Sequence, residues 1–131
     1  FVMKSAGHIF VDRKNHEKAI KSLNKAKRSF LKNPRSILLY PEGTRSIDGS
    51  MKKFKPGGLI FGAQLGISIV PIYYSGTFEL LDKGSFKIKR NQKIKLKIGE
   101  PIKVSDYDYS KRRELAELVQ KKVLKLSKES K

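Results

Sequence analysis

The chain has 131 residues, 38% of them hydrophobic, which suffices for a single domain with its own core. Lysine and arginine together number 30 against 12 aspartates and glutamates, so the net charge is +18. Such a charge favours anionic partners: nucleic acid, an acidic lipid surface, phosphorylated small molecules or an acidic carrier protein. The chain has no cysteine, which excludes a disulfide framework, a thiolate nucleophile and a cysteine-based metal site.

The first third of the chain predicts a strand followed by a helix. Residues 7–11 combine a glycine with β-favouring side chains and are followed by Asp12 and Arg13, as expected of a short strand. We expect Asn15 to cap the helix, and Asn33-Pro34 to end it. Between these ends, apolar residues recur at helical spacing: Ala19, Ile20, Leu23, Ala26, Phe30 and Leu31.

The middle of the chain predicts a strand, a long loop, a helix and another strand. Residues 37–40 form a short, continuously apolar run, which is typical of a strand covered on both faces. The loop over 41–56 is longer than a connection requires, which favours a functional role. A short helix is expected over 57–65 and a strand over 67–74, in which Pro71 indicates an edge position or a bulge.

The stretch from Gly57 to Phe78 contains no charged residue, which raises the alternative of a membrane span. Its glycines, Gln64 and Pro71 instead favour a buried helix, turn and strand.

Lysine alternates with isoleucine or leucine over residues 86–98, on either side of Asn91-Gln92, which predicts a half-exposed hairpin with a lysine-coated outer face. Residues 110–131 carry the apolar stripe of an amphipathic helix. The sequence therefore predicts an α/β fold: a central, mostly parallel or mixed sheet flanked by helices, with a lysine-rich hairpin and a C-terminal amphipathic helix.

A polar cluster follows the apolar run at 37–40, where ligands of α/β sheets bind. Arg45 offers a planar fork of donors that suits a phosphate or carboxylate. Gly43 permits close backbone approach and Thr44 adds a hydroxyl donor, while Glu42 is placed to orient the arginine or to bind a substrate hydroxyl. The alternative is an ordinary turn with a local Glu–Arg pair. Further cations follow on the same loop: Lys52, Lys53 and Lys55.

A second arginine, Arg13, also stands at the end of an expected strand, and two such arginines favour an anion site. His8 and Asp12 lie about 13 Å apart if residues 7–11 are a strand, too far for a hydrogen bond. His16 has no acidic residue placed to orient it except the neighbouring Glu17. We therefore expect neither a general base nor a metal site in this chain.

Four blocks occur in the order and spacing of the glycerolipid acyltransferases: GHIFVDR (7–13), LLYPEGTRS (38–46), DGSMKKFKPGG (48–58) and IVPIYYSG (69–76). The chain most resembles the 1-acylglycerol-3-phosphate (lysophosphatidate) acyltransferases. The resemblance implies acyl transfer from acyl-CoA or acyl carrier protein to a lysophosphatidate hydroxyl, with no bound cofactor. It also implies substrate-binding roles for Asp12, Arg13, Glu42, Gly43, Thr44, Arg45, Ser46, Lys55, Gly57, Val70 and Pro71.

One departure from the family concerns its catalytic block, a histidine followed after four residues by an aspartate, which lies before the segment matching 7–13 and is absent here. We expect residues 1–131 to be the C-terminal portion of one acyltransferase domain, truncated before Phe1 and inactive alone; a pseudoenzyme is the alternative. This segment then supplies phosphate anchoring, while the base for the hydroxyl proton comes from elsewhere.

The expected partners are a lysophospholipid acceptor, acyl-CoA or an acidic acyl carrier protein, and an anionic membrane surface at its cytoplasmic face. Two other functions stay open. One is a related acyltransferase with another acceptor, such as glycerol 3-phosphate or an aminolipid. The other is a basic nucleic-acid-binding module, which the charge favours but which lacks RNA-stacking aromatic residues on the hairpin and a recognition helix; no nucleic-acid partner is expected.

Overall fold

The computed structural model of the protein describes residues 16–81, 84 and 87–129. The chain divides into two compact units, residues 1–38 and residues 39–131, which are considered separately. The expected strand at 7–11, the cap at Asn15 and the predicted site residues Asp12 and Arg13 lie outside the described residues.

The first unit contains helix α2, His16–Lys32, at the position that the apolar spacing predicts. Glu17 lies in its first turn and Lys32 in its last, so both charges complement the helix dipole. Ala26 and Phe30, four residues apart on one face, are buried. The N–H of Asn33 still donates to the C=O of Ser29, and Pro34 then prevents the helix from continuing.

The strand expected at residues 37–40 is absent from the structure. Leu38 is 65% exposed and Tyr40 67% exposed, and the run pairs with no strand in the described parts of the chain. An apolar run becomes a strand only when neighbouring backbone accepts and donates its hydrogen bonds. The pattern of 37–40 is thus that of a buried strand, but a pairing partner is lacking among the described residues.

The second unit is built on an antiparallel pair of strands, β1 (Ile72–Ser75) and β2 (Lys95–Ile98), in which Ile72 pairs with Ile98 and Ser75 with Lys95. An isolated bridge joins Ile69 to Ile102 just before this ladder. Two residues separate the bridge from the ladder on the first segment and three on the second, which is the count of a β-bulge.

Pro71 lies on the shorter segment, opposite the extra residue of this bulge, where its C=O accepts a hydrogen bond from the N–H of Gly99. A proline can donate no ladder hydrogen bond, and the bulge tolerates that loss. The expectation of an edge position or a bulge at Pro71 is confirmed.

The hairpin expected over 86–98 is not formed, because β2 pairs with β1 instead of with the preceding lysine-rich segment. Residues 87–94 contain a turn but no strand. The expected lysine-coated outer face is also wrong: Leu96 is 52% and Ile98 63% exposed, whereas Lys97 is half-buried and its ammonium donates to the C=O of Glu129. Pairing with β1 puts the lysine side of β2 towards the end of the C-terminal helix.

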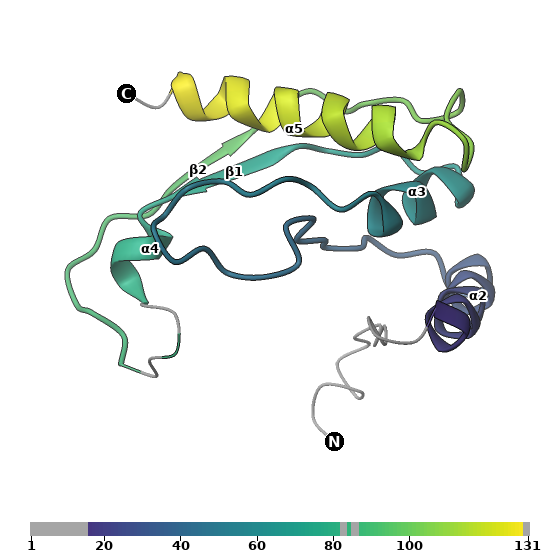
Figure 1. The fold of residues 1–131 in the computed structure, drawn as a ribbon, viewed down its shortest axis with the longest axis horizontal. Coiled ribbons are helices and arrows are strands. Elements are labelled where there is room, and N and C mark those ends of the chain that lie inside the picture. Colours follow the sequence, from purple (N-terminus) through teal and green to yellow (C-terminus); the bar gives the residue numbers. More distant parts are fainter. Residues whose placement is uncertain (1–15, 82–83, 85–86, 130–131) are drawn as a thin grey trace. The chain divides into compact units, whose positions relative to one another are not determined.

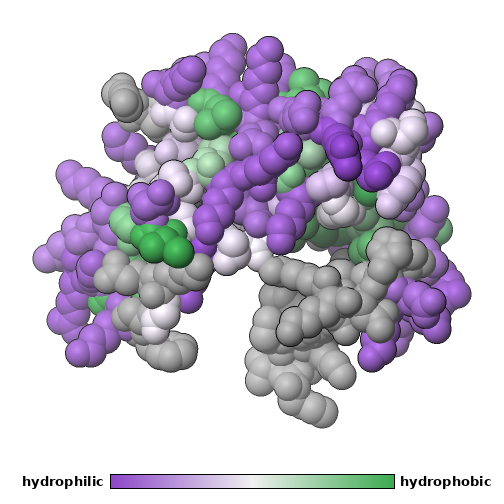
Figure 2. Space-filling view, in the orientation of Figure 1, coloured by the Kyte–Doolittle hydropathy of each residue, from purple (hydrophilic) through white to green (hydrophobic). Residues whose placement is uncertain are grey.

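In the described residues of this unit there are three helices: α3 (Pro56–Gln64), α4 (Thr77–Leu80) and α5 (Arg112–Lys128). Helices α3 and α5 form where the sequence predicts a short buried helix and a C-terminal amphipathic helix. Figure 1 shows α5 lying along the two strands, with α3 beside its N-terminal half, and α5 contacts both α3 and β1. In Figure 2, hydrophilic side chains cover most of the visible surface of α5.

The core lies between α5, α3 and the segments around the strands. Its buried members are Phe54, Leu59, Ile60, Ile102, Val104, Leu115, Ala116, Val119 and Val123. The fold is therefore mixed α/β, and the described residues contain a two-stranded antiparallel sheet rather than a parallel one. Within the described part of the chain, none of the helices has the length and apolar character that a bilayer crossing requires.

Candidate functional site

The loop that follows Tyr40 is closed by two hydrogen bonds between its ends. The N–H of Lys55 donates to the C=O of Pro41 at 2.8 Å, and the N–H of Lys52 donates to the Glu42 carboxylate at 2.7 Å. The half-buried Glu42 thus binds the backbone of the loop's far end. This hydrogen bond is one that the sequence does not reveal, and it brings the lysines of residues 52–55 next to the Glu42–Ser46 turn.

The turn itself depends on Gly43. Its φ of +70° lies in the left-handed region, which is costly for residues with a Cβ, and its N–H donates to the C=O of Tyr40 at 3.0 Å. Thr44 and Arg45 follow, and both side chains are exposed. Both side chains therefore reach solvent, and the Thr44 hydroxyl donates to the C=O of Arg45 at 3.4 Å.

Ser46 and Asp48 serve the loop itself. The Ser46 hydroxyl oxygen accepts from the N–H of Gly49 at 3.0 Å. Asp48 accepts from both the N–H and the hydroxyl of Ser50, at 3.0 and 2.7 Å. The hydrogen bonds from Ser50, assisted by the charge of Lys52, keep the pKa of Asp48 below its usual value. The carboxylate therefore remains ionised and holds the turn at neutral pH.

Lys55 lies directly over Gly43. A Cβ placed on Gly43 would stand 3.3 Å from Cδ and 3.4 Å from Nζ of Lys55, so the absence of a side chain makes room for the lysine. Lys55 is also the residue that precedes α3, whose first residue is Pro56. Lys55, the N-cap residue, makes no side-chain cap bond, so the backbone N–H groups of α3 add positive potential at this end of the loop.

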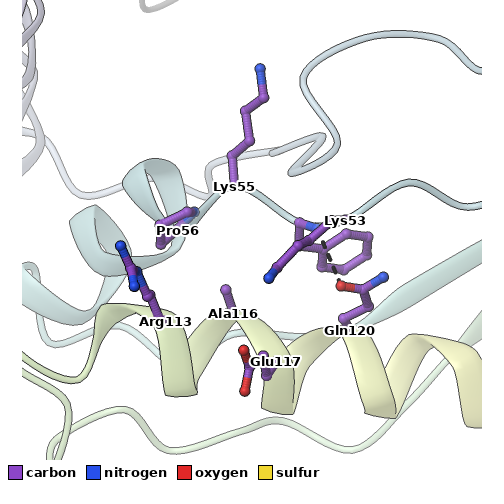
Figure 3. Close-up of a pocket in the computed structure, with 8 residues that line it drawn as sticks. Lys53, Lys55, Pro56, Arg113, Ala116, Glu117 and Gln120 are labelled. Carbon is purple, nitrogen blue, oxygen red and sulfur yellow. Dashed lines mark hydrogen bonds between the residues drawn. The ribbon is translucent and has the colours of Figure 1, made fainter.

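A hollow of about 330 Å³ lies between the extended segment before α3 and the first half of α5 (Figure 3). Three cations and one carboxylate line it: Lys53, Lys55, Arg113 and Glu117. Its remaining walls are Phe54, Pro56, Ala116 and Gln120. In Figure 3 Lys55 extends away from α5, so its ammonium serves the Gly43 side of the segment.

The other predicted site residues are less closely associated with this loop. Gly57 is exposed in the first turn of α3, and a Cβ there would meet no atom within 4 Å. Val70 is exposed and Pro71 is buried, both opposite the bulge and just before β1. In the part of the chain that the structure describes, no group of three or more histidine, aspartate or glutamate side chains is arranged to hold a metal ion.

Two residues that hold this site together were missed in the sequence. Gln120 binds the backbone on both sides of Lys53. Gly58 leaves room for the side chain of Leu39, because a Cβ on Gly58 would stand 2.5 Å from Cδ1 of that leucine. Gln120 carries a signal that was available: it lies four residues after Ala116 on the buried side of an amphipathic helix, where a polar residue needs a hydrogen-bonding partner. Gly58 carries no such signal.

Comparison with known proteins agrees with the four sequence blocks. The family model described as Acyltransferase matches residues 1–75, which contain the first three blocks and nearly all of the fourth. The 1-acyl-sn-glycerol-3-phosphate acyltransferase of Limnanthes douglasii is 37% identical over 106 residues, which cover 81% of this chain and 37% of that protein. The enzyme of the same name from Haemophilus influenzae is 31% identical over 127 residues, covering 94% of this chain and 52% of that protein.

A solved structure resembles the fold as well. The crystal structure of the 1-acyl-sn-glycerophosphate acyltransferase PlsC from Thermotoga maritima matches with a TM-score of 0.64 and 30% sequence identity, over 84% of this chain and 46% of that one. The chain thus spans about half or less of the length of these relatives. The family model covers more than half of the 131 residues, and the resemblance found in the sequence is confirmed. The chain belongs to the acyltransferase family.

Proposed function

We propose that the full-length protein transfers an acyl chain to the free hydroxyl of 1-acylglycerol-3-phosphate and so forms phosphatidate, with the loop from Glu42 to Lys55 holding the phosphate of the acceptor. The names of the relatives support this acceptor. The acyl donor is acyl-CoA or an acyl carrier protein. A related phosphorylated acceptor such as glycerol 3-phosphate would use the same loop.

The observation that carries the proposal is the position of Lys55 over Gly43 at the uncapped N-terminus of α3. The Lys55 ammonium, the N-terminus of α3 and the exposed guanidinium of Arg45 all belong to this loop or to its end. A phosphate there gains a two-pronged partner in the arginine and a point charge in the lysine. Glu42 has a supporting role, because its carboxylate closes the loop by binding the N–H of Lys52.

The chemistry requires a second part of the protein. A hydroxyl attacks a thioester only with a base to take its proton and with donors that stabilise the oxyanion. The chain covers 37% and 52% of the length of two relatives, which supports the inference that the histidine–aspartate block of the family lies in another part of the full-length protein. For the complete domain we infer a larger, mostly parallel sheet, in which residues 37–40 would find a strand partner. The isolated segment positions the acceptor but does not turn it over.

Steady-state kinetics of the full-length protein test the phosphate site. Arg45→Lys keeps the charge but loses the two-pronged geometry, so it should raise KM for lysophosphatidate about tenfold or more. The KM for the acyl donor should stay nearly unchanged. Lys121→Gln, which removes a cation from an exposed position on α5, is the matched control and should alter neither constant. If Arg45→Lys leaves the acceptor KM untouched, or weakens only the donor, the loop does not hold the phosphate.

The large positive charge supports a peripheral contact with an anionic membrane at the cytoplasmic face. Exposed Leu96 and Ile98 alternate with Lys95 on β2, so apolar and cationic side chains occur together there. Binding to anionic vesicles should weaken sharply with salt and should exceed binding to neutral vesicles. Equal binding to both would rule out an electrostatic contact.

A further inference from the structure

The side-chain amide of Gln120 bridges α5 and the extended segment before α3. Its Oε1 accepts from the N–H of Phe54 at 3.2 Å, and its Nε2 donates to the C=O of Lys52 at 3.3 Å. Figure 3 shows the side chain reaching from α5 to this segment, with the bond to Phe54 dashed. One carboxamide thus meets a backbone acceptor and a backbone donor on either side of Lys53, as a peptide group of a neighbouring strand would.

These bonds fix the segment against rotation about its own axis. The ring of Phe54 is in the core and only 6% exposed, so the segment is anchored by a side chain on one side and by Gln120 along its backbone. The next residue is Lys55, whose N–H is bound to the C=O of Pro41. A turn of the backbone at Phe54 would therefore move Lys55 off Gly43.

We propose that Gln120 is a positioning residue of the acceptor-phosphate site: by holding the backbone of Lys52 and Phe54 it places the Lys55 ammonium beside Gly43. The inference rests on the proposed function of the loop and adds a residue from outside the segment that the family model matches. Gln120 touches no substrate. Its effect passes through the backbone of residues 52–55.

Replacement of Gln120 by methionine separates this role from packing. Methionine has a similar length and volume but neither donates nor accepts strongly, so the helix packing is kept while both backbone bonds are lost. In the full-length protein, Gln120→Met should raise KM for lysophosphatidate about three- to tenfold, with kcat and the donor KM changed less than twofold.

Two controls identify the cause. Leu118 lies on the same helix and packs against the core, so Leu118→Ala should lower the thermal stability at least as much as Gln120→Met without changing the acceptor KM. Gln120→Glu keeps an acceptor for the N–H of Phe54 but turns a second acceptor towards the C=O of Lys52. It should therefore raise the acceptor KM as Gln120→Met does, showing that the site needs both ends of the amide.

Amide hydrogen exchange gives a readout that does not depend on activity. In Gln120→Met the Phe54 amide should exchange about tenfold faster relative to core amides of α5, and in Leu118→Ala it should not. An unchanged acceptor KM in an active Gln120→Met variant overturns the proposal, and so does an unchanged Phe54 exchange rate. If Arg45→Lys shows that the loop binds no phosphate, the proposed function is wrong. Faster Phe54 exchange in Gln120→Met would then show that Gln120 stabilises the segment but does not position a phosphate site.

Discussion

The bond between Glu42 and the N–H of Lys52 allows a quantitative test of how the loop is held. The carboxylate oxygen lies 2.7 Å from the backbone nitrogen in a half-buried position, and the second tie of the loop is the 2.8 Å bond from Lys55 to Pro41. Glu42→Gln retains an acceptor but removes its charge. Glu42→Ala removes the acceptor and leaves the Lys52 N–H without its partner.

The two variants should differ in magnitude. A hydrogen bond to a charged group contributes about 1.5–3 kcal/mol and a neutral one about 0.5–1.5 kcal/mol, so Glu42→Gln should make loop opening easier by about 1 kcal/mol. That is about a fivefold rise in the opening equilibrium. A part-buried N–H without a partner costs about 1–3 kcal/mol, so Glu42→Ala should raise the same equilibrium by about five- to 150-fold.

Exchange of the Lys52 amide, followed by NMR in the full-length protein, measures this opening directly. The rate should rise in the order wild type, Glu42→Gln, Glu42→Ala, while core amides such as that of Val119 keep their protection. Glu100→Gln removes the same charge from an exposed position and should leave the Lys52 rate unchanged. If Glu42→Ala does not accelerate exchange at Lys52, or accelerates every amide equally, the carboxylate does not close the loop.

Two further predictions concern stability. Gly76 has a φ of +85°, and a Cβ there would stand 2.0 Å from the backbone oxygen of Lys93, so Gly76→Ala should lower the free energy of unfolding by about 2 kcal/mol or more. Gly66→Ala has a similar φ but no atom within 4 Å of its Cβ, so it should lose only the free energy of the strained left-handed backbone. If urea unfolding shows equal losses of unfolding free energy in the two variants, there is no clash at Gly76. Hydrogen bonds, that of the Ser110 hydroxyl above all, lower the pKa of Asp108 below 3.8, so this carboxylate stabilises the fold above that pH and loses its effect as the pH falls through the lowered value. The stability difference between wild type and Asp108→Asn should accordingly shrink in acid, and a difference that is independent of pH would contradict the assignment.

Local sequence determined three of the helices, α2, α3 and α5, and the family, whereas α4 was not predicted. The apolar positions of α5 repeat at helical spacing within one continuous segment. An amphipathic helix can therefore be predicted without knowing which elements pack against its apolar face. Pro71 likewise indicated an irregular strand, because a residue without an N–H loses a ladder hydrogen bond in any sheet. The anion site at Glu42–Ser46 was predicted from residue types that act over a few residues, and it stays a prediction.

Strand pairing and the ties of the loop were decided only in three dimensions. The alternation of residues 86–98 is compatible with any antiparallel partner of suitable pattern, and pairing with β1 rather than with the preceding segment left Leu96 and Ile98 exposed and Lys97 half-buried. Gln120 binds a backbone more than sixty residues earlier in the chain, since the separations are 66 and 68 residues. Every residue other than proline has the same backbone N–H and C=O, so the sequence does not show which of them a side chain will bind. The partners of Gln120 and Glu42 therefore follow only from the way in which α5, α3 and the strands pack together.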